Sequence, residues 1–320
     1  MLVNNPTYYG ICSNLREIVR LAKGRGMKVL ADEAHGTHFY FGEGLPASAM
    51  AAGADMAAVS MHKSGGSLTQ SSLLLTGPEI NPHYTRQIIN LTQTTSGSYL
   101  LLSSLDVSRR NLALNGKDIF RRVFELSQYA RDEINDIGGY YAYSGELVNG
   151  DAIFAFDRTK LSVCTLGIGL AGIEVYDLLR DEYDIQVEFG DIGNILAYVS
   201  VGDSDKNIER LVSALAEIKR LYARDRAGML EYEYIAPRGV LAPQEAFFAE
   251  KQSVTLEESV GRVCAEFVMS YPPGIPILAP GEEITEEIFR HIRYAKEKGC
   301  FLTGTEDLTV SRINVLKGVR

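Results

Sequence analysis

In the first quarter of the chain, short apolar segments typical of strands alternate with stretches in which apolar residues recur at helical spacing. Three short apolar segments with the length of strands occupy residues 28–35, 54–63 and 72–77. Helical stretches separate such segments, which predicts a mostly parallel sheet with helices on its faces. The helix over residues 14–26 is the clearest, because its apolar residues keep helical spacing: Leu15, Ile18, Val19 and Ala22.

A second helical region is predicted over residues 98–137, with a break at Gly116. After it the pattern indicates a smaller α/β unit. Its strands are expected at 160–167 and 194–202, with a helix at 171–184 between them. A further amphipathic helix is predicted over residues 205–222, with Asp203 or Ser204 as its N-cap.

A linker rich in charged residues, glycine and proline spans residues 223–243 and precedes a C-terminal α+β region. The segment Tyr271–Pro276 is too rich in proline for a helix or a central strand. We expect a stiff turn there, in which a cis peptide bond is feasible. Thr285 is expected to cap a last helix that ends at Lys298–Gly299.

Composition and charge narrow the classes of function. The 320 residues are 46% hydrophobic and 23% charged, as in soluble globular proteins, and no apolar run is long enough to cross a bilayer. The N-terminus has no secretory pattern, so a cytoplasmic protein is expected. A net charge of -9 argues against nucleic acid or an anionic membrane as partner and is compatible with a cationic small substrate.

The four cysteines are widely spaced and form no CxxC pair: Cys12, Cys164, Cys264 and Cys300. This spacing favours reduced thiols over zinc ligands or a disulfide framework.

Candidate chemistry begins with the segment Ser60–Lys63. Lys63 follows an apolar strand, lies beside His62, and precedes a turn with two glycines, where a backbone can approach a ligand. Such a lysine is suited to a Schiff base with pyridoxal 5′-phosphate (PLP), an electron sink for a bond broken at a substrate Cα. Ser60 could donate to the cofactor phosphate. Taken alone, the motif describes a surface lysine more often than a cofactor site.

The segment DEAHG supplies the second element. Asp32 is expected as a buried carboxylate at the end of a strand, where it can keep a pyridine nitrogen protonated through a charge-assisted bond. Alone, Asp32 is more often a loop or capping acid. His35 and His38 are three residues apart without a confirming acidic cluster, so a metal site is the weaker reading. The same letters occur in helicases, but the phosphate-binding GxxxxGK[ST] motif is absent from the chain.

Together these motifs give the chain a specific resemblance. It is similar to the bacterial ornithine/lysine/arginine decarboxylases of the aspartate-aminotransferase-like PLP fold, and among them to biosynthetic-type arginine decarboxylases. The matching segments run nearly end to end: NPTYYG (5–10), VLADEAHGTHFYF (29–41), AGADMAAVSMHKSGGSLTQSS (52–72), SYLLLSSLDVSRR (98–110) and YPPGIPILAPGE (271–282).

The resemblance implies roles for individual residues. Lys63 would form the Schiff base, Asp32 would pair with the pyridinium, and His62 would help to reprotonate the substrate Cα. Ser60 would bind the phosphate. Further contacts to the cofactor would come from four positions: Ala34 and His35 at the ring, and Thr95 or Ser96 at the phosphate across a dimer interface.

The resemblance also assigns Glu188 to the distal cationic group of the substrate, which a carboxylate can clamp. By itself Glu188 would be a solvated acid on the polar side of an alternating segment, at the end of a strand. Gly97 stands where the family usually has proline, so a more flexible loop is expected there.

The family's pattern begins well before NPTYYG, so an N-terminally truncated enzyme is expected, with an apolar sheet edge and face left open. The predicted architecture is α/β in three parts. An incomplete, mostly parallel PLP-binding domain (1–125) is followed by a small α/β domain (126–225) and a C-terminal α+β decarboxylase domain (226–320). The expected assembly is a homodimer or a higher homo-oligomer.

The expected activity is PLP-dependent decarboxylation of arginine to agmatine, with lysine or ornithine as alternative substrates. A truncated, non-catalytic remnant of such an enzyme is the competing hypothesis. Transamination on the same fold is less favoured, because aminotransferases of this fold generally lack the proline-rich C-terminal part.

Overall fold

The computed structural model describes residues 1–225, 235–271 and 274–319. The chain divides into two compact units. The first comprises Met1–Gly138, Ala142–Ser162 and Ala197–Ser213, and the second comprises Gly139–Tyr141, Val163–Leu196 and Ala214–Arg320. The three predicted domain ranges stay a prediction. No helix within the described residues is both long and apolar enough to span a bilayer.

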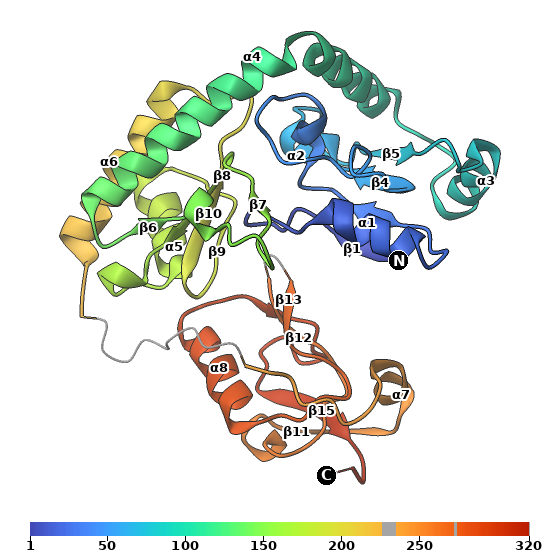
Figure 1. Ribbon diagram of the computed structural model, residues 1–320. Helices are drawn as coiled ribbons and strands as arrows, with labels where there is room; N and C mark the ends of the chain where they lie inside the picture. The colour runs from blue at the N-terminus through green and yellow to red at the C-terminus, as the bar shows by residue number, and fades with distance from the viewer. Residues whose placement is uncertain (226–234, 272–273, 320) are drawn as a thin grey trace. The chain divides into compact units, whose positions relative to one another are not determined.

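A four-stranded sheet forms the centre of the first unit (Figure 1). The order is β1-β3-β4-β5, and the β1–β3 and β3–β4 pairs are parallel while β4–β5 is antiparallel. This confirms the predicted mostly parallel sheet. Its strands are β1 (Leu2–Asn4), β3 (Leu30–Asp32), β4 (Met56–Val59) and β5 (Leu73–Thr76).

The two faces of this sheet differ. Helix α1 (Leu15–Lys23) confirms the first predicted helix, and its N-cap Asn14 accepts a bond from the Glu17 backbone N–H at 3.2 Å. The apolar side of α1 packs with one face of the sheet in a buried cluster: Leu15, Val19, Ala22, Val29, Ala31, Ala49, Ala52, Ala54 and Ala57. On the other face apolar side chains remain exposed, among them Leu2 (76%), Leu30 (41%) and Leu74 (41%).

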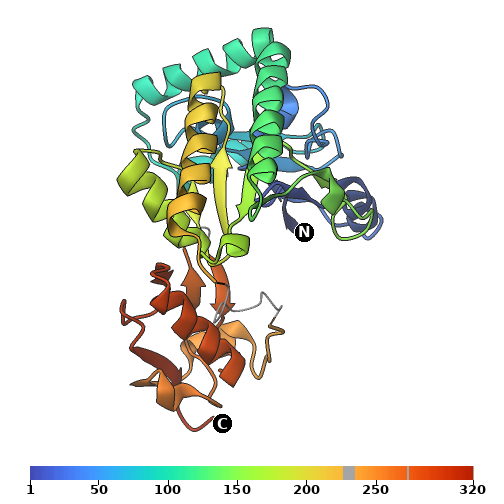
Figure 2. The same cartoon turned by 90° about the vertical axis from the view of Figure 1, so that its left-hand side faces the viewer.

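Two consecutive helices follow the sheet in the first unit: α3 (Pro82–Thr92) and α4 (Tyr99–Ile137). The predicted break at Gly116 is wrong, because α4 is one helix of 39 residues, although its ribbon changes direction along its length (Figures 1 and 2). A side chain at Gly116 would lie 2.8 Å from Phe41 Cβ and 2.9 Å from the Phe41 carbonyl oxygen. Close packing, not helix termination, therefore explains this glycine.

The predicted elements of the middle region are present. A second four-stranded sheet has the order β6-β8-β10-β9, and β2 pairs with β7. Helix α6 (Asp205–Tyr222) has the predicted bounds. Three predicted elements are present but shorter than predicted: β8 (Lys160–Cys164), α5 (Gly172–Tyr183) and β10 (Asn194–Tyr198). Four short strands were not predicted: β2 (Ile11–Cys12), β6 (Tyr141–Ala142), β7 (Ala155–Phe156) and β9 (Phe189–Gly190).

The other helices, 3-10 turns and strands of the described chain are short, apart from α8. They are η1 (Thr37–Tyr40), α2 (Met61–Ser64), η2 (Gly145–Leu147), η3 (Leu166–Ile168), α7 (Pro243–Phe248), β11 (Lys251–Thr255), η4 (Glu257–Ser259), β12 (Val268–Ser270), β13 (Ile275–Leu278), α8 (Glu286–Glu297), β14 (Leu302–Thr303) and β15 (Arg312–Leu316). The C-terminal part pairs β11 with β15 and orders the other three strands β13-β12-β14.

The last predicted helix is confirmed as α8, where Thr285 accepts a bond from the Ile288 backbone N–H at 3.2 Å. In the proline-rich segment, residues 272–273 lie outside the described residues, as do residues 226–234 of the predicted linker. The prediction of a turn up to residue 276 is wrong at its end, since β13 already begins at residue 275. β13 lies at a sheet edge, where Pro276 needs no N–H for the ladder.

Candidate active site

Two neighbouring parallel strands place the predicted cofactor residues Asp32 and Lys63 at the same end of the first sheet. β3 ends at Asp32, which pairs in register with Ala58 of β4. β4 ends at Val59, and the chain then turns through Ser60 into the four-residue helix α2, which contains Lys63. Asp32 and Lys63 therefore both lie at the carboxyl ends of parallel strands, where ligands bind in sheets of this kind.

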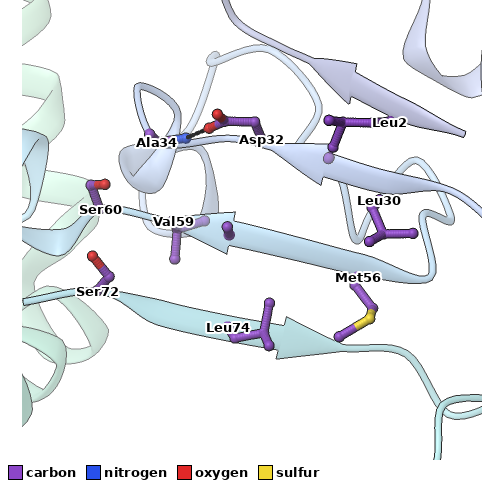
Figure 3. A pocket seen from close by; sticks show the side chains of 11 residues that line it. Leu2, Leu30, Asp32, Ala34, Met56, Val59, Ser60, Ser72 and Leu74 are labelled. Carbon is purple, nitrogen blue, oxygen red and sulfur yellow. Dashed lines mark hydrogen bonds between the residues drawn. The ribbon is translucent and has the colours of Figure 1, made fainter. Parts of the chain in front are cut away.

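A cavity of about 380 Å³ opens along this part of the sheet (Figure 3). It brings together three of the predicted cofactor residues, Asp32, Ala34 and Ser60. Asp32 Oδ1 accepts a bond from the Ala34 backbone N–H at 3.1 Å. The Asp32 side chain is exposed and not buried as the sequence suggested. The cavity is lined by Leu2, Leu30, Ala31, Asp32, Ala34, Met56, Ala58, Val59, Ser60, Ser72 and Leu74.

Lys63 and His35 are not among the residues that line this cavity, but they contact each other. Lys63 Nζ lies 2.9 Å from His35 Nε2, and 5.3 Å from the centroid of the Tyr8 ring. The Tyr8 and His35 ring centroids are 3.8 Å apart. Burial, together with the positive charges of Lys63 and Lys160, lowers the pKa of His35 to about 3. His35 is thus a neutral ring beside the predicted Schiff-base lysine.

His62 is oriented by the backbone of a neighbouring loop. Its Nδ1 lies 3.0 Å from the Ser71 carbonyl oxygen, which can only accept a hydrogen bond. In the neutral ring Nδ1 therefore carries the hydrogen and Nε2 keeps its lone pair. The predicted role of His62 in reprotonation stays a prediction.

A buried polar cluster contacts α2 through Ser64. His38 Nδ1 is 3.1 Å from Ser64 Oγ, and its Nε2 is 2.8 Å from Asp157 Oδ2. Lys160 Nζ is 3.6 Å from the same Asp157 oxygen, and both residues are fully buried. Thr159 donates to Asp157 Oδ1 from its backbone N–H and its hydroxyl, at 3.0 and 2.8 Å.

The charge states in this cluster follow from its packing. Burial alone would raise the pKa of Asp157, but His38, Lys160 and Thr159 together hold it well below its usual range. Burial lowers the pKa of His38, against the opposing effect of Asp157. The cluster thus pairs the buried Lys160 ammonium with an ionised carboxylate. Sequence reasoning missed Asp157 and Lys160 and considered His38 only as a weak metal ligand.

Glu33, inside the DEAHG segment, stabilises the local structure. It is fully buried, accepts bonds from the Tyr40 hydroxyl at 2.5 Å and the Ala49 backbone N–H at 2.7 Å, and so fixes the loop that follows β3. Burial raises the pKa of Glu33 to about 7, although both bonds oppose the shift.

The remaining predicted residues, Thr95, Ser96 and Glu188, are exposed. Thr95 and Ser96 are exposed in the segment between α3 and α4, and Ser96 N–H donates to Thr94 Oγ1 at 3.2 Å. Glu188 belongs to the second unit. The predicted strand ending at Glu188 is wrong, because β9 begins only at Phe189. Its side chain is exposed, while its backbone N–H donates to the Leu196 carbonyl at 2.9 Å.

Two protein-family models together match most of the chain. The Orn/Lys/Arg decarboxylase major domain matches residues 1–207, and the Orn/Lys/Arg decarboxylase C-terminal domain matches residues 229–304. An arginine decarboxylase of Halalkalibacterium halodurans is 45% identical over 99% of this chain and 65% of its own length. Arginine decarboxylases of Bacillus anthracis and Bacillus subtilis are both 42% identical over 99% of this chain, and over 65% and 66% of their own lengths.

Solved structures show the same fold at lower identity. The Escherichia coli constitutive lysine decarboxylase superposes with a TM-score of 0.76 at 21% identity, over 99% of this chain and 58% of that chain. The Francisella novicida lysine decarboxylase superposes with a TM-score of 0.75 at 20% identity, over 99% of this chain and 57% of that chain. This chain thus spans slightly less than two thirds of the length of the arginine decarboxylases that it matches. On its sequence and its fold, the chain belongs to the Orn/Lys/Arg decarboxylase family.

Proposed function

We propose that this chain carries the catalytic lysine of a PLP-dependent decarboxylase that converts arginine to agmatine. The single observation that carries the proposal is the placement of Asp32 and Lys63 at the carboxyl ends of adjacent parallel strands. Arginine decarboxylases 42–45% identical to the chain support arginine over lysine or ornithine. Since the chain spans part of those relatives, the activity of the whole protein belongs to this proposal.

The side chains at this edge fit the cofactor. Asp32 offers an exposed carboxylate to the cavity, as a protonated pyridine nitrogen requires. The Ser60 hydroxyl makes no capping bond to α2, and a phosphate would accept a bond from it. Lys63 supplies the primary amine. We propose that these residues, with Ala34 and His35 beside the ring, would hold PLP. When bound, PLP draws electrons from the bond broken at the substrate Cα.

Two histidines of the chain have proposed roles beside the cofactor: His35 orients the Lys63 amine, and His62 handles the proton. His35 is neutral and buried, so it can accept a hydrogen bond from the Lys63 amine without competing for its proton. Because His62 Nδ1 points to the Ser71 carbonyl, its Nε2 is the nitrogen left to hold a proton for the substrate Cα. We propose that His62 returns this proton after carbon dioxide has left.

Glu188 is proposed as the partner of the distal guanidinium. Its carboxylate is exposed, so it can take a planar cation in two parallel bonds. Glu188→Gln tests the role: KM for arginine should rise more than tenfold, with a smaller change in kcat. An unchanged KM would remove Glu188 from the substrate site. The neighbouring exposed acid Asp184, changed to Asn, is the control.

A second copy of the chain is the proposed partner. Helix α3 has no buried residue, and apolar side chains of α3 and of the first turns of α4 are largely exposed, with Leu91 at 81%, Tyr99 at 86% and Leu100 at 70%. Thr95 and Ser96 lie between these helices, where they would reach the phosphate of the other copy. Sedimentation equilibrium should give a dimer for the wild type and a monomer for Leu91→Asp/Leu100→Asp. A monomeric wild type contradicts this part.

A cytoplasmic location is also proposed. All four cysteines are free, which suits a reducing compartment.

The main experiment maps where the cofactor attaches. The chain is mixed with PLP, reduced with borohydride, digested and analysed by mass spectrometry. We expect the label on Lys63 and its loss in Lys63→Ala, while exposed lysines such as Lys117 serve as internal controls. A label elsewhere, or none, contradicts the proposal.

Carbon dioxide release from labelled arginine, lysine and ornithine then ranks the substrates. Preference for lysine or ornithine would correct the substrate. Label on Lys63 without turnover would favour the competing hypothesis, a non-catalytic remnant of a decarboxylase.

A further inference from the structure

Polar contacts run from Lys63 into the buried part of the first unit. Lys63 Nζ lies 2.9 Å from His35 Nε2, and the other ring nitrogen, Nδ1, is in hydrogen-bond contact with the Tyr198 hydroxyl. Tyr198 is the last residue of β10, 163 positions away from His35 in the sequence. His35 is 5% exposed, so the two contacts fix a ring with little access to water.

Lys63 and the Tyr198 hydroxyl together determine which nitrogen of His35 carries the hydrogen. A lysine ammonium has three donors and no acceptor, so Nε2 accepts while that contact holds, and the hydrogen on Nδ1 then needs an acceptor of its own. In the neutral ring the hydrogen then resides on Nδ1 and is donated to the Tyr198 oxygen. His35 thus needs an acceptor on its Nδ1 side in order to present a lone pair to Lys63.

Tyr198 is held by the buried ion pair described above. Lys160 Nζ lies 3.8 Å from the centroid of the Tyr198 ring, a cation–π contact made by a buried lysine. Asp157 Oδ2 lies 3.6 Å from the same Lys160 Nζ, and His38 joins Asp157 to Ser64, the residue after Lys63. The contacts therefore start at Lys63 and return to its neighbour in α2.

We propose that Tyr198 is a positioning residue: its hydroxyl keeps His35 in the tautomer that presents the Nε2 lone pair to the Lys63 amine. The importance of that amine rests on the proposed function, whereas the tautomer is a property of the free chain. No motif of the sequence includes Tyr198. Its contribution comes from the position of β10 beside the loop that follows β3.

A purely structural role for Tyr198 would leave the tautomer unchanged. The hydroxyl could serve only to fill space at the end of β10, and its removal would then alter stability alone. The two roles differ in one measurable quantity, the site of the hydrogen on His35. This quantity can be read in the protein without cofactor.

The experiment is nitrogen NMR of the ¹⁵N-histidine-labelled chain, in which five histidines give a simple spectrum. His35→Gln assigns the His35 signals. We expect hydrogen on Nδ1 in the wild type, and a shift toward the Nε2–H form in Tyr198→Phe. Tyr129→Phe is the matched control, because the Tyr129 hydroxyl donates to the exposed Glu209 at 2.6 Å in the same unit. It should leave the His35 signals in place.

A second measurement follows the rate at which PLP attaches to Lys63, read by absorbance and by the borohydride label. Tyr198→Phe removes the contact at His35 Nδ1 and, through the tautomer, the hydrogen bond that orients the Lys63 amine, so attachment should slow by about tenfold or more. Tyr129→Phe should match the wild type.

The outcomes separate this inference from the proposed function. An Nε2–H or a doubly protonated His35 in the wild type, or an unchanged tautomer in Tyr198→Phe, overturns the inference even if PLP attaches normally. If PLP does not attach to Lys63 at all, the proposed function fails, and the NMR result still decides the role of Tyr198.

Discussion

Replacing Glu33 by glutamine should change how the stability of the first unit depends on pH. Glu33 is fully buried and its carboxyl accepts bonds from Tyr40 and Ala49. Burial raises its pKa from an ordinary value of 4.5 to about 7. Such a group binds a proton in the folded state that it releases in the unfolded chain. Stability is therefore full below about pH 4.5 and falls as the pH rises toward 7.

The size of the effect follows from the shift. One pKa unit corresponds to about 1.4 kcal/mol, so ionisation of Glu33 costs the folded state roughly 2.5 kcal/mol between about pH 5 and pH 8. Buried histidines act in the opposite direction, since burial lowers the pKa values of His35, His38 and His291. Their contribution is the same in both proteins and cancels in the difference between wild type and Glu33→Gln.

The assay is urea unfolding at several pH values between about 5 and 8, read by hydrogen exchange of peptides from residues 29–64. These peptides report on the first unit separately from the second. We expect the stability of Glu33→Gln relative to wild type to increase by about 2.5 kcal/mol across this range. Glu17→Gln, which changes an exposed acid paired with Arg20 on α1, is the control and should show no such trend. A constant difference for Glu33→Gln would refute the reasoning.

Three further changes test packing and charge by urea unfolding. Gly116→Ala should destabilise by about 1–3 kcal/mol, because its Cβ would meet Phe41, although alanine favours helices; a more stable variant would contradict this packing. Asp157→Asn should cost about 3–5 kcal/mol by removing the carboxylate that faces the buried Lys160 ammonium, and Asp157→Asn/Lys160→Met should cost less than the sum of the single changes, so strict additivity would count against the ion pair. Thr285→Ala should cost about 1 kcal/mol through the lost N-cap of α8, and an unchanged stability would contradict a stabilising cap.

Periodic burial explains which parts of the fold could be predicted. Helix α6 has the predicted bounds, and α8 begins after the predicted cap at Thr285, because both carry a regular apolar face. The strands that position Asp32 and Lys63 were recognised as short apolar segments. Gly116 was misjudged, because a glycine required for close packing against Phe41 has the same local signature as a helix break.

The surroundings of Lys63 show the limit of local patterns. His35 was predicted from its motif, but its partner Tyr198 is the end of an ordinary apolar strand, NILAY. Lys160 begins β8 and gives no sign in the sequence that it is fully buried. Asp157 and the Tyr198 ring both stabilise its charge, and those contacts exist only after distant strands have packed. The residues that bind a cofactor repeat in motifs, whereas the groups that orient them depend on long-range packing. Site prediction from a single sequence therefore finds the first kind and misses the second.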